Sequence, residues 1–325
     1  MPEGFEGRGL LAFSDPAGAK ACLGLAAMLV HRGEASPTLV SNRHHAFYAD
    51  WSLTVEVVES FAVDALPQRP DWIFTGTSHP DSSKRFELGV LQQARAQGIP
   101  STAFVDHWTN LRLRFVAADG SMVFPDQILL PDEKALALAV ADGLPAALLQ
   151  IAPNPYLEYI RTVWQPQMQP GAVWEAAGVP SVYTRYVLYA PDPISLRNGD
   201  GIWPFDEGSA LADIAAALKD FPGTALLVKP HPLQPPGILT EAIAAANTYL
   251  PVYEVHAPDN LELARAADLV IGFHSNFLLE AQAIGKKIVR YFPAGEHLDA
   301  IAHLATGCKV TDARELMPTF AGLFR

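Results

Sequence analysis

Short apolar runs alternate with amphipathic segments along almost the whole chain from Gly9 onward. Such runs predict strands and the segments between them predict helices, and regular alternation of the two is typical of βαβ units and parallel sheets. With 325 residues the chain exceeds one core of ordinary size, which favours two domains of roughly 150 residues each. We therefore expect an α/β protein that contains two parallel sheets.

The predicted elements divide into two series. The first half is expected to form strands at 9–14, 36–41, 53–58, 71–75, 100–105, 126–130 and 147–151, with helices at 17–32, 82–97 and 132–142. The second half is expected to form strands at 186–190, 224–228, 251–256, 268–272, 287–291 and 308–310. Its helices are expected at 207–220, 236–247 and 311–325, with two more beginning near Ser275 and Glu296. A polar, proline-bearing stretch at 164–171 interrupts the alternation and is suited to a linker. This places domains at 1–165 and 180–325.

Composition excludes several classes of protein. Half of the residues are hydrophobic and 18% are charged, so a compact globular chain is expected. The net charge of −12 argues against a nucleic-acid or anionic-membrane partner, because both require a basic surface. No apolar run approaches the roughly 18 to 20 residues of a transmembrane segment, and residues 1–4 lack the basic start of a signal peptide. We expect a cytoplasmic protein.

The chain shows no strong metal or cofactor motif. Its two cysteines, Cys22 and Cys308, form neither a zinc set nor a disulfide framework, and both are expected to be reduced core residues. The ten histidines include no His-x-x-x-His pair on a carboxylate-bearing helix. Glycine signatures of P-loop NTPases, α/β-hydrolases and nicotinamide dehydrogenases are also absent. No metal and no cofactor are therefore expected.

Residues just after predicted strands are the best site candidates, because ligands of open α/β sheets lie beyond the carboxyl ends of the strands. In the second half these positions hold Asp192, Lys229, His231, His256, His274, Ser275 and Asn276. Two prolines stiffen the Lys-Pro-His-Pro sequence at 229–232 (the 229–232 loop). Ser275 and Asn276 suit a helix N-terminus, whose N–H groups favour phosphate. Together they predict a phosphate site, although Lys229 alone could be an exposed lysine and Ser275 alone a helix cap.

In the first half, the richest strand end is Asp106-His107-Trp108. A carboxylate and an imidazole beside an aromatic ring could supply a general base and a surface for a sugar. We favour Asp106 as the base over His107 and Asp15. The structural alternative is that Asp106 caps a helix beginning at Trp108 and that His107 packs against it.

These motifs resemble a known group of enzymes. Two Rossmann-like halves with Lys-Pro-His-Pro at 229–232 and Gly-Phe-His-Ser-Asn-Phe-Leu-Leu-Glu-Ala at 272–281 are similar to glycosyltransferases of the GT-B fold. Within that fold the His-Pro loop and the serine-bearing helix start resemble bacterial sialyltransferases, Kdo transferases and CDP-glycerol glycerophosphotransferases. The resemblance implies two domains facing a central cleft, the first for the acceptor and the second for the nucleotide-sugar donor.

The resemblance also implies roles for individual residues. Lys229, His231 and His274 would lie at the donor, His231 would contact its phosphate, Ser275 and Asn276 would bind that phosphate, and Glu280 would approach the ribose. The implied reaction is metal-independent transfer of a sugar, with a CMP-linked acidic sugar favoured, to a glycan, lipid or protein acceptor. Gly76-Thr77-Ser78 also resembles UDP-N-acetylglucosamine 2-epimerases, so an epimerase or a nucleotide-sugar hydrolase is an alternative. A non-catalytic protein that binds a nucleotide sugar is another.

Overall fold

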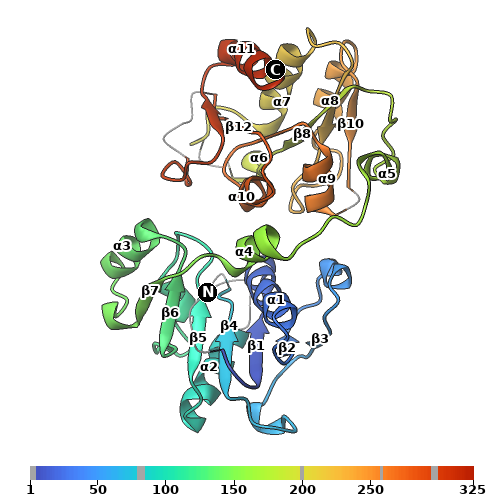
Figure 1. The fold of residues 1–325 in the computed structure, drawn as a ribbon. Coiled ribbons are helices and arrows are strands. Elements are labelled where there is room, and N and C mark those ends of the chain that lie inside the picture. Colours follow the sequence, from blue (N-terminus) through green and yellow to red (C-terminus); the bar gives the residue numbers. More distant parts are fainter. Residues whose placement is uncertain (1–4, 79–84, 198–200, 257–258, 294–298) are drawn as a thin grey trace. The chain divides into compact units, whose positions relative to one another are not determined.

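The chain forms two compact units, Met1–Trp164 (unit 1) and Gln165–Arg325 (unit 2), in a computed structural model. The structure describes residues 5–78, 85–197, 201–256, 259–293 and 299–325. Figure 1 shows unit 1 from blue to green and unit 2 from green to red, each with a sheet and flanking helices. Two Rossmann-like α/β units confirm the predicted fold class.

Unit 1 contains a seven-stranded parallel sheet in the order β3-β2-β1-β4-β5-β6-β7. Its strands are β1 (Gly9–Phe13), β2 (Thr38–Ser41), β3 (Val55–Val57), β4 (Trp72–Thr75), β5 (Ser101–Phe104), β6 (Gln127–Leu130) and β7 (Leu149–Ile151). Its helices are α1 (Pro16–His31), α2 (Phe86–Gln97), α3 (Glu133–Ala141) and α4 (Pro155–Thr162). The order reverses between β1 and β4, which is where open sheets of this type bind ligands.

Unit 2 contains a six-stranded parallel sheet in the order β10-β9-β8-β11-β12-β13. Its strands are β8 (Arg185–Ala190), β9 (Thr224–Val228), β10 (Val252–Glu254), β11 (Leu269–Gly272), β12 (Ile288–Tyr291) and β13 (Cys308–Val310). Its helices are α5 (Pro170–Ala176), α6 (Ile194–Arg197), α7 (Glu207–Leu218), α8 (Thr240–Ala246), α9 (Asn260–Ala266), α10 (Asn276–Ala283) and α11 (Ala313–Leu323). Here the reversal lies between β8 and β11.

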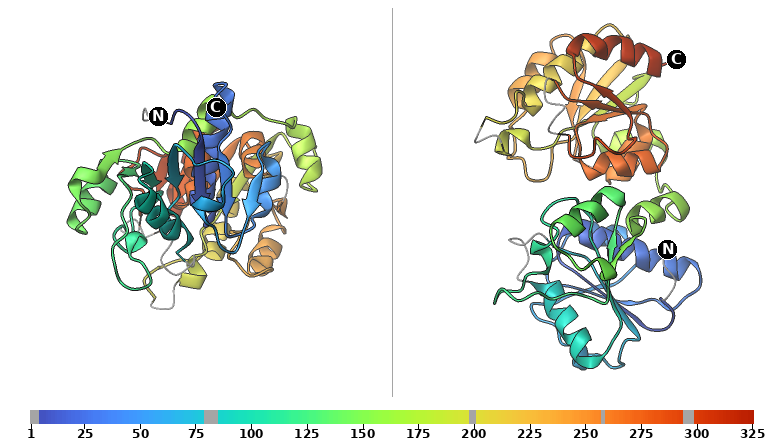
Figure 2. Two further views of the ribbon diagram at one scale, coloured as in Figure 1. Left: turned by 90° about the horizontal axis from the view of Figure 1, so that it is seen from below. Right: turned by 90° about the vertical axis from the view of Figure 1, so that its left-hand side faces the viewer.

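Both faces of each sheet are covered by helices, as Figure 2 shows. In unit 2 the side chains of β9 alternate between two cores. Leu226 and Val228 pack in the cluster that contains Leu211 of α7, and Leu227 packs with Leu263 of α9. A strand buried on both faces is a continuous apolar run, which is why these strands are visible in the sequence.

Every predicted strand is present, and the differences concern helices. The helix predicted at 82–97 begins at Phe86, after its N-cap Arg85, and residues 82–84 lie outside the described residues. The helix start expected near Glu296 also lies outside them. The sequence prediction missed α4, α6, α9 and α5, which begins at the end of the proposed linker. Helix α5 buries Val173 and Trp174 against the core of unit 2. It is short, so its apolar face has too few turns to be recognised before packing reveals it.

The two cysteines differ in environment. Cys22 is buried in α1 as expected, and burial, followed by the nearby Glu87 carboxylate, raises the pKa of its thiol. Cys308 is exposed, so the prediction that it is a core residue is wrong. It occupies the first position of β13, a strand at the end of the sheet order. Edge strands bury fewer side chains than central strands do.

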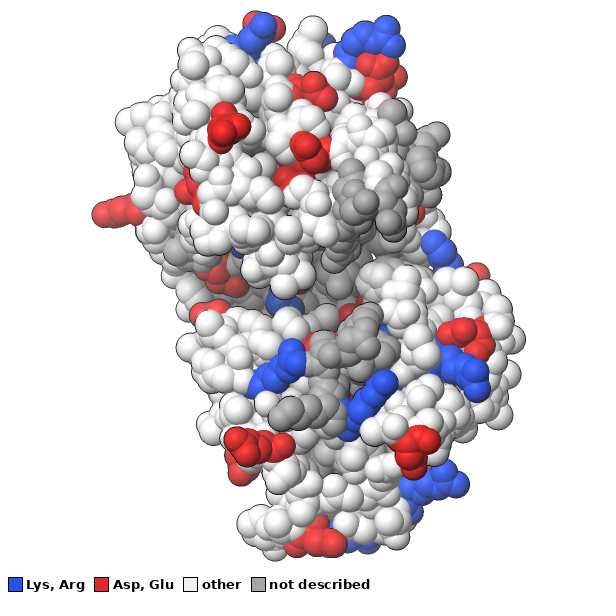
Figure 3. All heavy atoms as spheres, turned by 180° about the vertical axis from the view of Figure 1, so that it is seen from behind, with Lys and Arg blue, Asp and Glu red and all other residues white. Residues whose placement is uncertain are grey.

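Charged side chains are dispersed on the face shown in Figure 3, where acidic and basic groups alternate among uncharged residues. That dispersal agrees with local capture of a small anion better than with binding of a polyanion. Among the described residues, no helix combines the length and apolar character that a membrane span requires.

Replacing Gly76 by alanine is expected to destabilise unit 1 by about 1–3 kcal/mol, because the added methyl group has room only if the backbone beside it shifts. A Cβ at Gly76 would lie 2.7 Å from the Cα of Gly18, at the point where α1 approaches the end of β4. Gly89→Ala is the matched control, because a Cβ there meets nothing within 4 Å and Gly89 lies inside α2. It should stabilise the unit by about 0.5–1 kcal/mol. Urea unfolding followed by circular dichroism measures both changes, and equal stability of the two variants would contradict the expectation.

Candidate functional site

The candidate site in unit 2 lies at the carboxyl edge of its sheet. The 229–232 loop follows β9, and His274 and Ser275 follow β11. Strands β9 and β11 are the two neighbours of β8, so these segments flank the end of β8 from both sides. At about 4.8 Å between strands, the two segments start about 10 Å apart. That span suits an extended phosphate-linked ligand better than a single small ion.

The backbone of the 229–232 loop has no N–H group to offer a ligand. The Lys229 N–H donates to the Tyr189 carbonyl at 2.9 Å. The His231 N–H donates to Gln234 Oε1 at 2.6 Å. Pro230 and Pro232 have no N–H to donate. Hydrogen bonds donated by this loop to a ligand would therefore come from the side chains of Lys229 and His231.

The protonation of His231 is constrained by its own loop. The Leu233 N–H donates to His231 Nδ1 at 3.2 Å. Because Nδ1 accepts this bond, a neutral His231 ring carries its proton on Nε2. Nε2–H is a hydrogen-bond donor of the kind that a phosphate oxygen accepts.

A pocket of about 400 Å³ lies beside this loop, between the ends of β9 and β10. Lys229, His231 and His256 line it together with Glu254, and the remaining lining includes prolines and Ile238. His256 Nε2 lies 2.8 Å from Glu254 Oε1. The volume lies within the range of small-ligand sites. The pocket combines cationic or donor groups with an apolar wall, as a nucleoside phosphate requires.

On the other side of β8, the reversal point of the sheet presents Asp192, His274 and Ser275. Asp192 is buried, and its Oδ2 accepts the His274 N–H at 3.1 Å, which ties the end of β8 to the end of β11. The His274 ring stacks on Trp203 and on Phe292, with interplanar angles of 13° and 20°. The backbone bond to Asp192 and the two ring contacts thus fix the position of His274.

Two polar atoms at this reversal point, His274 Nδ1 and Ser275 Oγ, are buried and have no hydrogen-bond partner among the residues that the structure describes. Ser275 has N-cap backbone angles, yet its side chain does not cap α10. Buried polar atoms are normally paired with protein, water or ligand. The hydroxyl of Ser275 is therefore available beside the first N–H groups of an eight-residue helix.

The other predicted donor residues lie on α10. Asn276 is the first residue of the helix and is partly exposed, whereas Glu280 is buried. Neither of them lines the pocket beside His231, nor does Ser275. The structure thus brings Lys229, His231 and His256 together, and it gathers Asp192, His274 and Ser275 into a second group across β8.

In unit 1, Asp106 is part of a buried ion pair. Arg114 Nη1 donates to Asp106 Oδ1 at 3.1 Å, and both side chains are at most 10% exposed. The same Arg114 nitrogen donates to the Thr77 carbonyl at 2.6 Å. No helix begins at Trp108, so the alternative in which Asp106 caps such a helix is wrong. Arg114 thus connects Asp106, at the end of β5, to Thr77 in the segment after β4.

His107 is held between two anchored neighbours. The Trp108 indole N–H donates to both carboxylate oxygens of Asp132, at 2.8 and 3.0 Å. Thr109 Oγ1 lies 2.9 Å from His107 Nδ1. With Asp106 and Trp108 both anchored, the partly exposed His107 ring is the oriented imidazole of this segment.

Asp15 lies at the reversal point of the first sheet, as the N-cap residue of α1. Its N–H donates to Ser78 Oγ at 3.2 Å, and Ser78 Oγ in turn donates to the buried carboxylate of Glu87. The Arg43 guanidinium lies 3.8 Å from the Asp15 carboxylate. The Ser78 hydroxyl thus cross-links the ends of β1 and β4 with α2.

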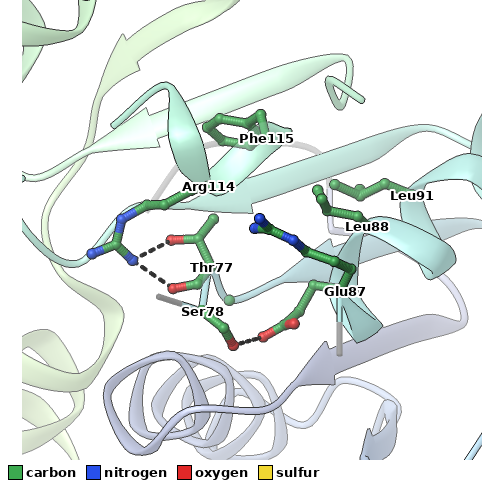
Figure 4. Close-up of a pocket in the computed structure, with 9 residues that line it drawn as sticks. Thr77, Ser78, Glu87, Leu88, Leu91, Arg114 and Phe115 are labelled. Atoms are coloured by element: carbon green, nitrogen blue, oxygen red, sulfur yellow. Dashed lines mark hydrogen bonds between the residues drawn. The ribbon is translucent and has the colours of Figure 1, made fainter. Parts of the chain in front are cut away.

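The space beside this cross-link is too small for a substrate. Figure 4 shows Thr77 bonded to Arg114 and Ser78 bonded to Glu87 around it. Its volume is about 10 Å³, which corresponds to one water molecule. Asp15 and His107 do not line this space, and both are partly exposed.

Several residues of these sites were not found from the sequence. Arg114 and Glu87 are buried charges in helical or turn segments with no distinguishing motif. In unit 2, Glu207 and Gln234 were also missed. Both are buried, and they are hydrogen-bonded to one another at 2.7 Å. The one usable signal is that Gln234 follows the Lys-Pro-His-Pro sequence by two positions.

Neither a protein-family model nor a curated protein sequence matches this chain. Solved structures do. The UDP-GlcNAc 2-epimerase of Neisseria meningitidis bound to UDP-GlcNAc has a TM-score of 0.68 at 11% identity, over 98% of this chain and 91% of its own. The Anabaena HepE protein in complex with UDP-glucose has a TM-score of 0.59 at 15% identity, over 97% and 90%.

A third similar structure is the glycotransferase of kitacinnamycin, with a TM-score of 0.56 at 14% identity over 99% of this chain and 91% of its own. At these identities the similarity concerns the fold. The chain has the GT-B type of fold, with two parallel-sheet α/β domains, as the sequence motifs had indicated.

Proposed function

We propose that this chain is an enzyme that acts on a nucleotide-activated sugar, with the nucleotide held by unit 2. The observation that carries the proposal is the arrangement at the carboxyl edge of the second sheet. A pocket with Lys229 and His231 lies on one side of β8, and the unpartnered Ser275 hydroxyl at the start of α10 lies on the other. The first group offers cations and an N–H donor, and the second offers a helix N-terminus for phosphate.

The nucleotide is proposed to be UDP. The resemblance of the His-Pro loop favours a CMP-linked acidic sugar, whereas the similar structures named above that contain a nucleotide contain UDP-GlcNAc or UDP-glucose. Both nucleotides share a pyrimidine and a phosphate. A diphosphate offers two phosphates, one for each of the two anion-binding groups on either side of β8.

The favoured reaction is transfer of the sugar to a glycan, lipid or protein acceptor, with residues 1–165 serving as the acceptor domain and residues 180–325 as the donor domain. Unit 1 is proposed to supply the acid–base group from Asp106, His107 and Asp15. His231, Lys229 and the start of α10 would stabilise the negative charge on the leaving phosphate. Glu280 would contact the ribose, and Asn276 the phosphate.

Epimerisation is the second candidate, because several similar structures are UDP-GlcNAc 2-epimerases, including that of Methanocaldococcus jannaschii (TM-score 0.63). Incubation with UDP-GlcNAc alone separates the candidates. An epimerase forms the 2-epimer without an acceptor, a hydrolase releases UDP into water, and a transferase releases UDP only when an acceptor is added. A non-catalytic binding protein binds UDP and gives none of these products.

Saturating UDP is expected to raise the melting temperature of the protein by about 5–10 °C at a hundred times its dissociation constant. Ligand linkage at that ratio contributes about 2.7 kcal/mol, and a unit of this size gains about 2–4 °C per kcal/mol. Differential scanning fluorimetry with UDP, CDP, CMP and GDP at equal concentrations measures the preference. No shift with any nucleotide would refute the proposed function, and a shift with CMP alone would change its donor.

Chelation with EDTA is expected to leave turnover unchanged, because the start of α10 and the cationic loop can neutralise the leaving phosphate. Among the described residues, no three His, Cys, Asp or Glu side chains are grouped as metal ligands. Loss of turnover in EDTA that Mg²⁺ or Mn²⁺ restores would contradict this expectation.

A further inference from the structure

Glu207, the first residue of α7, is a buried carboxylate with an unusual set of partners. It is 1% exposed and takes part in no ion pair among the described residues. Three donors surround its oxygens: the Ser195 hydroxyl at 2.6 Å, the Ser195 N–H at 2.9 Å and Gln234 Nε2 at 2.7 Å. Burial of a charge without a counter-ion is costly. An apolar residue would serve the core better, which points to a role beyond packing.

The bond to Gln234 continues into the 229–232 loop. Gln234 turns its Nε2 toward Glu207, so its Oε1 faces the His231 N–H and accepts it at 2.6 Å. The Gln234 N–H also donates to the His231 carbonyl at 2.8 Å. The backbone of His231 is therefore clasped by Gln234 through both its N–H and its carbonyl.

A carboxylate at position 207 determines which way the Gln234 amide is turned. An ionised carboxylate only accepts hydrogen bonds, so it excludes the orientation that would place Oε1 against it. In that excluded orientation Nε2 would face the His231 N–H, and two donors would meet. Glutamine at 207 could both donate and accept, so it would permit either orientation.

We propose that Glu207 is a positioning residue of the nucleotide site: by fixing the Gln234 amide it holds the 229–232 loop in the conformation that presents His231 Nε2–H to the phosphate. The loop turn that keeps Leu233 N–H on His231 Nδ1 depends on this clasp. The link to nucleotide binding rests on the proposed function. The link from Glu207 to the conformation of His231 does not.

Two variants and their combination test the proposal. Glu207→Gln is expected to speed hydrogen exchange of the His231 amide roughly tenfold, to mix the His231 tautomers and to weaken UDP binding roughly tenfold. Gln234→Leu removes the side-chain bond of the clasp, keeps its backbone bond and the bonds between Glu207 and Ser195, and should give the same changes. The double variant Glu207→Gln/Gln234→Glu exchanges donor and acceptor. The carboxylate now at position 234 accepts from both the His231 N–H and the side-chain amide at position 207. The amide exchange rate and tautomer of His231 and the UDP affinity should therefore return to those of the parent protein.

Nuclear magnetic resonance reports the amide exchange and the imidazole tautomer, and calorimetry reports UDP affinity. Glu241→Gln, an exposed glutamate of α8, is the control and should change none of them. Unchanged His231 exchange in folded Gln234→Leu, or a folded double variant that stays as impaired as Glu207→Gln, would overturn the proposal. If the parent protein does not bind UDP, the proposed function fails, and the exchange and tautomer measurements still decide the positioning role.

Discussion

Replacing His231 by alanine is expected to lower turnover roughly a hundredfold or more, the usual cost of removing one donor from a developing negative charge. The ring is partly exposed in a loop after β9, and because Nδ1 accepts the Leu233 N–H, a neutral ring carries on Nε2 the proton that a phosphate oxygen can accept. Because the side chain contributes little to the core, the melting temperature should hardly change. Turnover of UDP-GlcNAc or UDP-glucose and thermal unfolding measure the two effects.

Leu233→Ala is the matched control for this experiment. Leu233 lies in the same turn and is 66% exposed, and its backbone N–H, which alanine retains, makes the bond to His231 Nδ1. It should keep nearly full turnover. Normal turnover in His231→Ala, or loss of its fold, would remove His231 from the site.

Substitution of Asp106 by asparagine is expected to cut turnover roughly a hundredfold and leave UDP affinity nearly unchanged, if Asp106 is the general base. The substitution also removes the charge that compensates Arg114, whose side chain is 6% exposed. Breaking a buried ion pair costs about 3–5 kcal/mol of folding stability. We expect a loss of about 3 kcal/mol, because Arg114 keeps its bonds to Thr77. Urea unfolding of unit 1 and initial rates below the lowered melting temperature measure these effects.

Arg114→Lys separates catalysis from stability. It leaves the Asp106 carboxylate and a positive charge in place but cannot reproduce the guanidinium bonds to Thr77. If Asp106 acts only as a structural partner, both variants will lose turnover in proportion to the folded fraction. Should Asp106→Asn turn over normally while His107→Ala or Asp15→Asn is inactive, the base is one of those two residues and the fold is unaffected.

The strand pattern was predictable because it depends on local composition. The apolar runs 224–228 and 269–271 are central strands buried on both faces, so their character does not depend on which helix covers them. Short helices were not predictable in the same way. Helix α5 contributes two buried side chains, Val173 and Trp174, and only their contact with unit 2 distinguishes it from a linker.

The candidate site was predictable in part for a related reason. Parallel strands place all their carboxyl ends on one edge, so residues that follow strands gather there whatever the strand order is. That argument selects Lys229, His231 and Ser275 from the sequence. It does not say that β8 separates β9 from β11, nor that the pocket beside His231 opens toward β10 and His256.

The sequence by itself determined the class of fold, the number of strands and the strand ends that carry polar groups, because hydrophobic periodicity and turn residues act within a few positions. Only the tertiary structure decided the partners of the buried charges. Arg114 meets Thr77, 37 residues away, and Glu207 meets Gln234, 27 residues away. A buried charge is tolerated only where donors and acceptors from distant segments converge on it, and such convergence exists only after the sheets have assembled.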